Sequence, residues 1–206
     1  MARFFSLPLF LVFVFAFEIS SGRPIHAEIG KGAQGFIQEL ADEAVTSLTG
    51  EGISTIERRN RFRALMLEKF AFKVIAKWVL GRQWRKASQS ERTEYLRLFE
   101  DLMVVTYADR FAKYSGEKLT IKEAEVRGER DVLVHSLLTR AKGAQPIKVA
   151  WRVRKTEIGH KIVDVMVEGV SMGLAQKKEF ASVIRKNGGK LTSLLDELRK
   201  RLNKNI

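Results

Sequence analysis

The hydrophobic period of this sequence changes near Gly116, and the change restricts the chain to a fold with helices first and a sheet later. Before this glycine, apolar residues recur every three or four positions, which is typical of amphipathic helices. After it, apolar and polar residues alternate at about residues 118–126, 131–140, 146–155 and 160–168. Such alternation predicts half-buried strands. Because short turns separate the runs, we expect an antiparallel meander, since a parallel crossover needs about a dozen residues.

Capping signals predict where the helices begin and end. Ser54-x-x-Glu57 and Ser88-x-x-Glu91 are capping boxes, and Gly81 predicts the end of a short helix over 73–80. Further helices are expected over about 36–48, from Ser54 onward, and over 89–114, 174–186 and 191–203. The helix over 89–114 is apolar nearly all round in its middle, which is typical of a buried spine. We therefore expect an α+β fold, with helices packed on one face of a curved antiparallel sheet of about four to five strands.

The N-terminal segment has the pattern of an export signal. Arg3 precedes an almost purely apolar run over residues 4–17, and Ile25-His26-Ala27 suits a signal peptidase. We expect cleavage before Glu28, which leaves residues 28–206 as a single domain. An uncleaved membrane anchor is the alternative, but a helix of this run spans roughly 21 Å, short of the ~30 Å hydrocarbon core.

Composition excludes several classes of site. The chain has no Cys and three His, so it has no disulfide, thiolate zinc site, iron–sulfur cluster or cysteine nucleophile, and a transition-metal site is not expected. Its formal net charge of +13 favours an anionic partner. For an exported protein, lipid headgroups are a better match than nucleic acid. No cofactor is predicted.

One motif suggests hydrolysis and has to be weighed. Gly169-Val170-Ser171-Met172-Gly173 matches the G-x-S-x-G nucleophile elbow between a strand and a helix. In that fold the acid and the His follow the Ser, whereas the last His of this chain is His160. A strand-to-helix turn is therefore the favoured interpretation of the motif, and we predict no catalytic residue and no enzyme. Asp164, alone in an apolar strand, keeps an exported esterase or other small-molecule enzyme on a cone-like α+β fold open as the alternative.

Several segments resemble a known family. Residues 79–88, VLGRQWRKAS, residues 97–102, residues 161–172 and Asn187-Gly188-Gly189 resemble the MlaC / toluene-tolerance (Ttg2-type) family of periplasmic lipid-binding proteins. The similarity runs from about residue 36 to 199 in the same order and spacing. The chain departs from the family pattern at Ala71, Gln83, Ala150 and Lys178.

The resemblance implies a periplasmic carrier with an apolar lipid cavity between helices and sheet. Such a carrier moves phospholipid between an outer-membrane lipoprotein complex and an inner-membrane ABC transporter that bears a ring of lipid-binding domains, and so maintains outer-membrane lipid asymmetry. A carrier of hopanoid-related lipids is the alternative within the family. Peripheral contact with the membrane is also expected, and no contact with nucleic acid.

The candidate site combines an apolar set for the lipid tails with a polar set for headgroup or partner. The tails are expected to contact Phe70, Ile75, Val79, Phe99, Leu102, Tyr107, Val134, Leu138, Val149, Trp151 and Val153. The headgroup is expected near Arg82, Tyr107 or Arg110. Arg58, Arg59 and Arg61 are expected on a solvent-facing surface that contacts anionic headgroups or an acidic partner.

Overall fold

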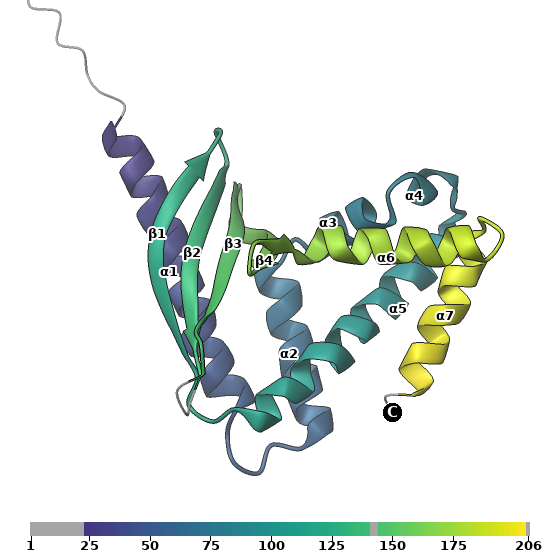
Figure 1. The fold of residues 1–206 in the computed structure, drawn as a ribbon, viewed down its shortest axis with the longest axis horizontal. Coiled ribbons are helices and arrows are strands. Elements are labelled where there is room, and N and C mark those ends of the chain that lie inside the picture. Colours follow the sequence, from purple (N-terminus) through teal and green to yellow (C-terminus); the bar gives the residue numbers. More distant parts are fainter. Residues whose placement is uncertain (1–22, 141–143, 205–206) are drawn as a thin grey trace, which may run out of the picture.

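The computed structural model describes residues 23–140 and 144–204 (Figure 1). Its elements in chain order are α1 (Arg23–Leu48), α2 (Thr55–Lys69), α3 (Phe72–Leu80), α4 (Arg82–Lys86), α5 (Gln89–Tyr107), the 3₁₀ helix η1 (Ala108–Lys113), β1 (Lys118–Arg127), β2 (Asp131–Thr139), β3 (Ile147–Thr156), β4 (Gly159–Val167), β5 (Val170–Ser171), α6 (Met172–Lys186) and α7 (Leu191–Asn203).

Most of the predicted signal segment, residues 1–22, lies outside the described residues, and its last five residues form the start of α1. That helix therefore begins earlier than the expected start near residue 36. Within 23–140 and 144–204, no helix has both the length and the apolar character needed to cross a bilayer.

Local capping explains where the helices begin. The Ser54 hydroxyl accepts a hydrogen bond from the Glu57 amide at 3.1 Å, and Ser88 and Glu91 form a complete capping box. Gly81 ends α3 with a φ of 61°, a conformation that glycine adopts without steric cost. The expected end of the long helix was wrong, because α5 ends at Tyr107 and continues as η1. The short helix α4 was not predicted.

The four predicted strands are confirmed as an antiparallel meander, to which β5 adds a two-residue edge strand. The order in the sheet is β1-β2-β3-β4-β5. A bulge in β4 shifts the register, so that Val153 faces Ile162 while Arg152 faces Asp164. The extra residue, Val163, turns Asp164 onto the face opposite to Ile162.

Two hydrophobic cores hold the fold together. Helix α1 lies along β1 and β2 on one face of the sheet, and α2 contacts α1, β4 and α5 (Figure 1). The core between these helices and the sheet, here the sheet core, contains Ala33, Ile37, Leu40, Ala44, Leu48, Leu65, Val132, Val134, Val153 and Ile162. The helical core lies among α3, α5, α6 and α7, with Met66 of α2, and centres on Phe72, Ala76, Val79, Tyr95, Leu98, Phe99, Leu102, Phe180, Leu194 and Leu198. Phe62 and Phe70 pack against both cores.

Candidate functional site

The apolar face of the sheet is buried unevenly along its length. Cross-strand pairing puts one set of side chains from β2, β3 and β4 on the same face. At one end, Val132, Val134, Val153 and Ile162 are at most 2 % exposed, because they pack in the sheet core. At the other end the apolar face is only partly covered. We call this part the half-buried end; it consists of the half-buried Leu138, Ile147, Trp151, Val165 and Val167, together with Val149, which is 8 % exposed.

The half-buried end contains one polar pair. The Trp151 indole Nε1 donates to the Ser136 hydroxyl at 3.0 Å, and that hydroxyl donates to the Val149 carbonyl at 2.9 Å. These two hydrogen bonds satisfy the buried Ser136 hydroxyl and fix the orientation of the indole ring. Leu138, Ile147, Val149 and Val167 belong to neither buried core. A sheet face of this kind, apolar and incompletely covered by protein, suits contact with an apolar ligand.

Most residues predicted to contact lipid tails lie in or against one of the two cores, and Leu138 and Val149 lie outside both. Val134 and Val153 lie in the sheet core, and Trp151 packs against it. Val79, Phe99 and Leu102 lie in the helical core, with Ile75 packed against it. Phe70 lies where the cores meet, and its backbone forms an isolated bridge with Ile162 of β4. Leu138 and Val149 lie at the half-buried end.

Part of the helical core is closed by aromatic packing. The Tyr95 ring stacks on Phe99 at a centroid distance of 5.7 Å, and both rings meet Phe180 edge-on. The Tyr95 hydroxyl donates to the Ala76 carbonyl at 3.0 Å, and burial raises the pKa of Tyr95 far above its usual value. Phe99 therefore serves as ordinary core in this conformation, with 2 % exposure.

Several residues at the half-buried end, and one at the seam where the two cores meet, were not predicted from the sequence. Phe62 joins both cores, and Ile147, Val165 and Val167 complete the half-buried end. The alternation of the strands contained this signal, because residues facing Leu138, Trp151 and Val149 across the sheet share their face. The pairing partner of each strand, however, depends on the register, and the bulge at Val163 could not be read from the periodicity.

The residues predicted to meet the headgroup lie apart from one another. Arg82 is exposed at the start of α4. Arg110 is exposed in η1, where its guanidinium lies 5.0 Å from the centre of the Tyr107 ring. Tyr107 and Arg110 thus form one local unit at the end of α5, whereas Arg82 belongs to the opposite end of that helix.

The arginines of α2 are largely engaged inside the protein. Arg58 is 8 % exposed, so its expected position on a solvent-facing surface was wrong. Its guanidinium donates to the carbonyls of Leu48 and Ile53, at 2.9 and 3.1 Å. These bonds close the loop between α1 and α2, which a sequence pattern does not reveal.

The neighbouring arginines on α2 bind carboxylates. Arg59 makes a bidentate pair with Asp109 at 3.1 and 2.8 Å, and Arg61 pairs with Glu57 at 2.7 Å. The hydrogen bond from Arg59 holds the pKa of Asp109 below its usual value. These pairs attach α2 to η1 and to its own first turn.

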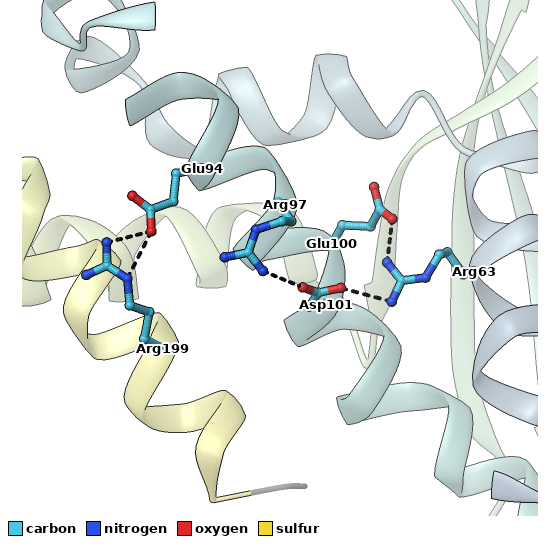
Figure 2. Close-up of polar contacts among 6 residues, drawn as sticks. All are labelled: Arg63, Glu94, Arg97, Glu100, Asp101 and Arg199. Carbon is cyan, nitrogen blue, oxygen red and sulfur yellow. Dashed lines mark hydrogen bonds and ion pairs between the residues drawn. The ribbon is translucent and has the colours of Figure 1, made fainter. Parts of the chain in front are cut away.

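Ion pairs also connect α5 to both of its neighbours. Figure 2 shows Arg63 of α2 between Glu100 and Asp101, at 2.5 and 2.9 Å, with Arg97 on the other oxygen of Asp101. Further along α5, Glu94 pairs with Arg199 of α7 at 2.5 Å. Each pair is partly exposed, so these contacts orient the helices more than they stabilise them.

The G-x-S-x-G segment forms a helix cap. The Ser171 hydroxyl accepts from the Leu174 amide at 3.0 Å and donates to Asp164 at 2.7 Å. The other Asp164 oxygen accepts from the amides of Val165 and Gly173. A Cβ at position 173 would lie 3.2 Å from that carboxylate and 3.1 Å from the Trp78 ring, so Gly173 permits this close packing. Asp164 and Ser171 thus satisfy the start of α6.

Neither His135 nor His160 completes a catalytic or metal site with this cap. His160 lies against Phe36, with ring centroids 5.7 Å apart, and burial together with nearby Lys155 lowers its pKa. His135 lies in β2 opposite Ala150. In the described part of the chain, no group of three His, Asp or Glu side chains is placed to hold a metal ion.

Comparison with known proteins now gives the context for this geometry. The family model described as MlaC protein matches residues 38–200, nearly all of the described chain. This chain belongs to the MlaC family. The resemblance of the sequence segments is thereby confirmed, and the α+β fold with an antiparallel sheet matches that of a solved phospholipid-binding protein.

That structure is the phospholipid-binding protein from Ralstonia solanacearum, solved in complex with a phospholipid. It matches with a TM-score of 0.75 and 23% identity, over 84% of this chain and 98% of that one. The intermembrane phospholipid transport system binding protein MlaC of Haemophilus influenzae is 26% identical over 113 residues. That alignment covers 53% of each MlaC chain, so the match spans about half the length of this curated relative.

Proposed function

We propose that this chain is a phospholipid carrier of the periplasm, and that the acyl tails bind between the half-buried end of the sheet and the seam where the two cores meet. The observation that carries the proposal is the uneven burial of one apolar sheet face. Its covered end is sealed by α1, while Leu138, Ile147, Trp151, Val165 and Val167 stay half-buried. The phospholipid bound by the Ralstonia relative and the transport role in the name of the Haemophilus relative support the same proposal.

The energetics of lipid transfer explain why a carrier needs such a surface. Exposing a chain of about 16 carbons to water costs roughly 0.8 kcal/mol per CH₂, or about 12 kcal/mol per chain. A carrier must cover most of that surface and still release the lipid to a membrane. Two separate cores joined at Phe62 and Phe70 allow the tails to enter by parting packed side chains, without disrupting either core.

The remaining steps depend on partners. We propose that lipid is exchanged with an outer-membrane lipoprotein complex and an inner-membrane ABC transporter with a ring of lipid-binding domains, and that this exchange maintains outer-membrane asymmetry. The headgroup stays at the surface, where water solvates its charge. Ser171 is a capping residue in this account, since its hydroxyl is engaged with Asp164 and the start of α6.

Phospholipid binding tests the proposal directly. Purified protein is incubated with phospholipid vesicles, separated from them, and its bound lipid is quantified by mass spectrometry. We expect stoichiometric intact phospholipid on the wild type and on Ser171→Ala, and no released fatty acid. A protein that stays free of lipid, or one that hydrolyses it through Ser171, would contradict the carrier.

A matched pair of variants locates the tails. Val149→Asp places a carboxylate at the half-buried end, whereas Ala150→Asp places the same charge on the opposite face of β3. We expect Val149→Asp to remain folded by circular dichroism and to lose its lipid, because an unpaired carboxylate against acyl chains costs several kcal/mol. Ala150→Asp should keep its lipid. An unfolded Val149→Asp would show instead that this residue is closed core.

A further inference from the structure

The junction of α3 and α6 exposes apolar side chains that the proposed tail site does not use. Among the described residues, seven large apolar side chains are exposed, and four of them lie at this junction. Val74 and Trp78 are one turn apart on α3, with 55% and 42% exposure, and Leu174 near the start of α6 is 42% exposed. Val170 in β5 is 55% exposed. We call these four residues the α3–α6 patch.

Trp78 of the patch lies directly against the start of α6, next to Leu174. Trp78 lies so close to Gly173 that a Cβ there would be 3.1 Å from its ring, and the Lys177 ammonium lies 4.5 Å from the ring centre. Helices α3 and α6 run side by side in Figure 1, away from α1. Trp78 and Leu174 therefore lie at one junction of two helices, in contrast to Ile158, which is exposed singly at the β3–β4 turn.

Lysines surround the patch and are not neutralised. Lys73 and Lys77 flank it on α3, and Lys177 and Lys178 on α6. Within 23–140 and 144–204, none of these four lysines forms an ion pair with a carboxylate. Carboxylates nearby are engaged elsewhere: Asp164 accepts from Ser171 and Gly173, and Glu179 binds Arg201.

We propose that the α3–α6 patch docks on an anionic phospholipid bilayer. Tryptophan and aliphatic side chains enter the interface between headgroups and acyl chains, and lysines extend along the apolar surface to reach phosphates. Each lysine near an anionic surface contributes about 1 kcal/mol to such binding. An ammonium on a flexible stem suits a fluid layer of phosphates, whereas an acidic protein surface is better matched by arginine forks.

The patch adjoins the proposed tail site along the chain. Phe70, at the seam of the cores, lies two residues before α3, and Val167 of the half-buried end lies three residues before Val170. Docking through the patch would therefore hold the seam close to the bilayer. This last step rests on the proposed function, but membrane docking itself is measured without lipid transfer.

Vesicle sedimentation tests the docking surface with matched controls. Vesicles of phosphatidylcholine with and without 30% phosphatidylglycerol serve as the probe. We expect binding to the anionic vesicles that weakens as salt is raised. Val74→Ser with Leu174→Ser should lower the partition coefficient at least tenfold, whereas Leu67→Ser with Ile158→Ser, two other exposed apolar residues, should leave it within twofold.

A second pair of double variants tests the charges, and both members lower the net charge by the same two units. Lys77→Gln with Lys177→Gln should reduce binding at least tenfold, and Lys118→Gln with Lys122→Gln on β1 should reduce it no more than threefold. Equal losses in both pairs would overturn docking through this face. A wild-type protein that does not bind anionic vesicles would also overturn the proposal, even if it binds an acidic protein through the patch.

Fluorescence of Trp78 gives a readout that does not depend on the stability of a patch variant. In Trp84→Phe with Trp151→Phe, Trp78 is the remaining indole, and we expect its emission to shift to the blue on anionic vesicles. An unchanged spectrum would contradict insertion. A protein that extracts phospholipid but fails these tests would support the proposed function and contradict docking through this surface. A protein that docks on vesicles through the patch but carries no phospholipid would support the docking surface and contradict the proposed function.

Discussion

Two clusters of basic residues, the arginines of α2 and the lysines of α3 and α6, differ in what their charges contact. Arg58 donates to the carbonyls of Leu48 and Ile53, while Arg59 and Arg63 bind carboxylates of η1 and α5. The lysines of α3 and α6 instead lie around exposed apolar side chains, and two of them rest over tryptophan rings. Both clusters add to the positive net charge, but their contacts assign them different roles.

The difference shows why a basic composition alone does not locate an interaction surface. A guanidinium with several fixed donors suits buried carbonyls and bidentate carboxylates, so the arginines hold helices together. An ammonium loses its hydration less readily and remains at the surface. We therefore expect substitutions on α2 to change stability, and substitutions on α3 and α6 to change binding.

The largest effect should come from Arg58. Arg58→Met keeps an apolar stem but leaves two carbonyls without their donors in the loop between α1 and α2. The expected loss is about 3 kcal/mol in the free energy of unfolding, measured by urea denaturation. The control Lys73→Met should cost less than about 0.5 kcal/mol, because Lys73 is exposed. Equal costs for the two variants would remove the distinction between the clusters.

A smaller effect is expected for Arg63. This side chain joins α2 to Glu100 and Asp101 of α5, but 35% of it is exposed, so solvent screens the pairs (Figure 2). Arg63→Met should cost about 1 kcal/mol. A double-mutant cycle with Asp101→Asn should give a coupling free energy of about 0.5 kcal/mol, and a coupling of zero would show that this pair only orients the helices.

The smallest effect is one of pH. Arg59 lowers the pKa of Asp109, so the stability from this pair is present above about pH 4, the ordinary range of an Asp, and is lost as the pH falls through the lowered pKa. In Arg59→Gln the pKa of Asp109 should rise toward the ordinary value, as measured by carbon NMR of the carboxyl group. A pKa that does not move would show that Arg59 does not control this carboxylate.

The parts of the fold that depend on local interactions could be predicted from the sequence. Ser54 and Ser88 identify the starts of α2 and α5, because each serine hydroxyl caps an amide three residues later. The alternation after Gly116 similarly predicted β1 to β4. The end of α5 at Tyr107 and the two residues of β5 depend on packing between distant segments, which periodicity does not encode.

The candidate site was predictable to a smaller extent. The strand pattern identified the apolar face that carries Val149 and Trp151, but not which part of it α1 covers, since that depends on how the helix crosses the sheet. The same limit explains Arg58, whose acceptors come from a loop that folds back on α2. The family resemblance indicated a lipid ligand without placing its tails.

Quenching by brominated acyl chains tests most directly whether the tails bind at the half-buried end. The variant Trp78→Phe with Trp84→Phe retains Trp151, whose indole lies on that face beside Val149. A matched variant, Trp78→Phe with Trp151→Phe, retains Trp84, which lies between Lys77 and Arg92 on the helical side. Loading each protein with phospholipid brominated along its acyl chains should quench Trp151 strongly and leave Trp84 nearly unchanged. Quenching of Trp84 with an unaffected Trp151 would place the lipid away from the sheet and contradict the account.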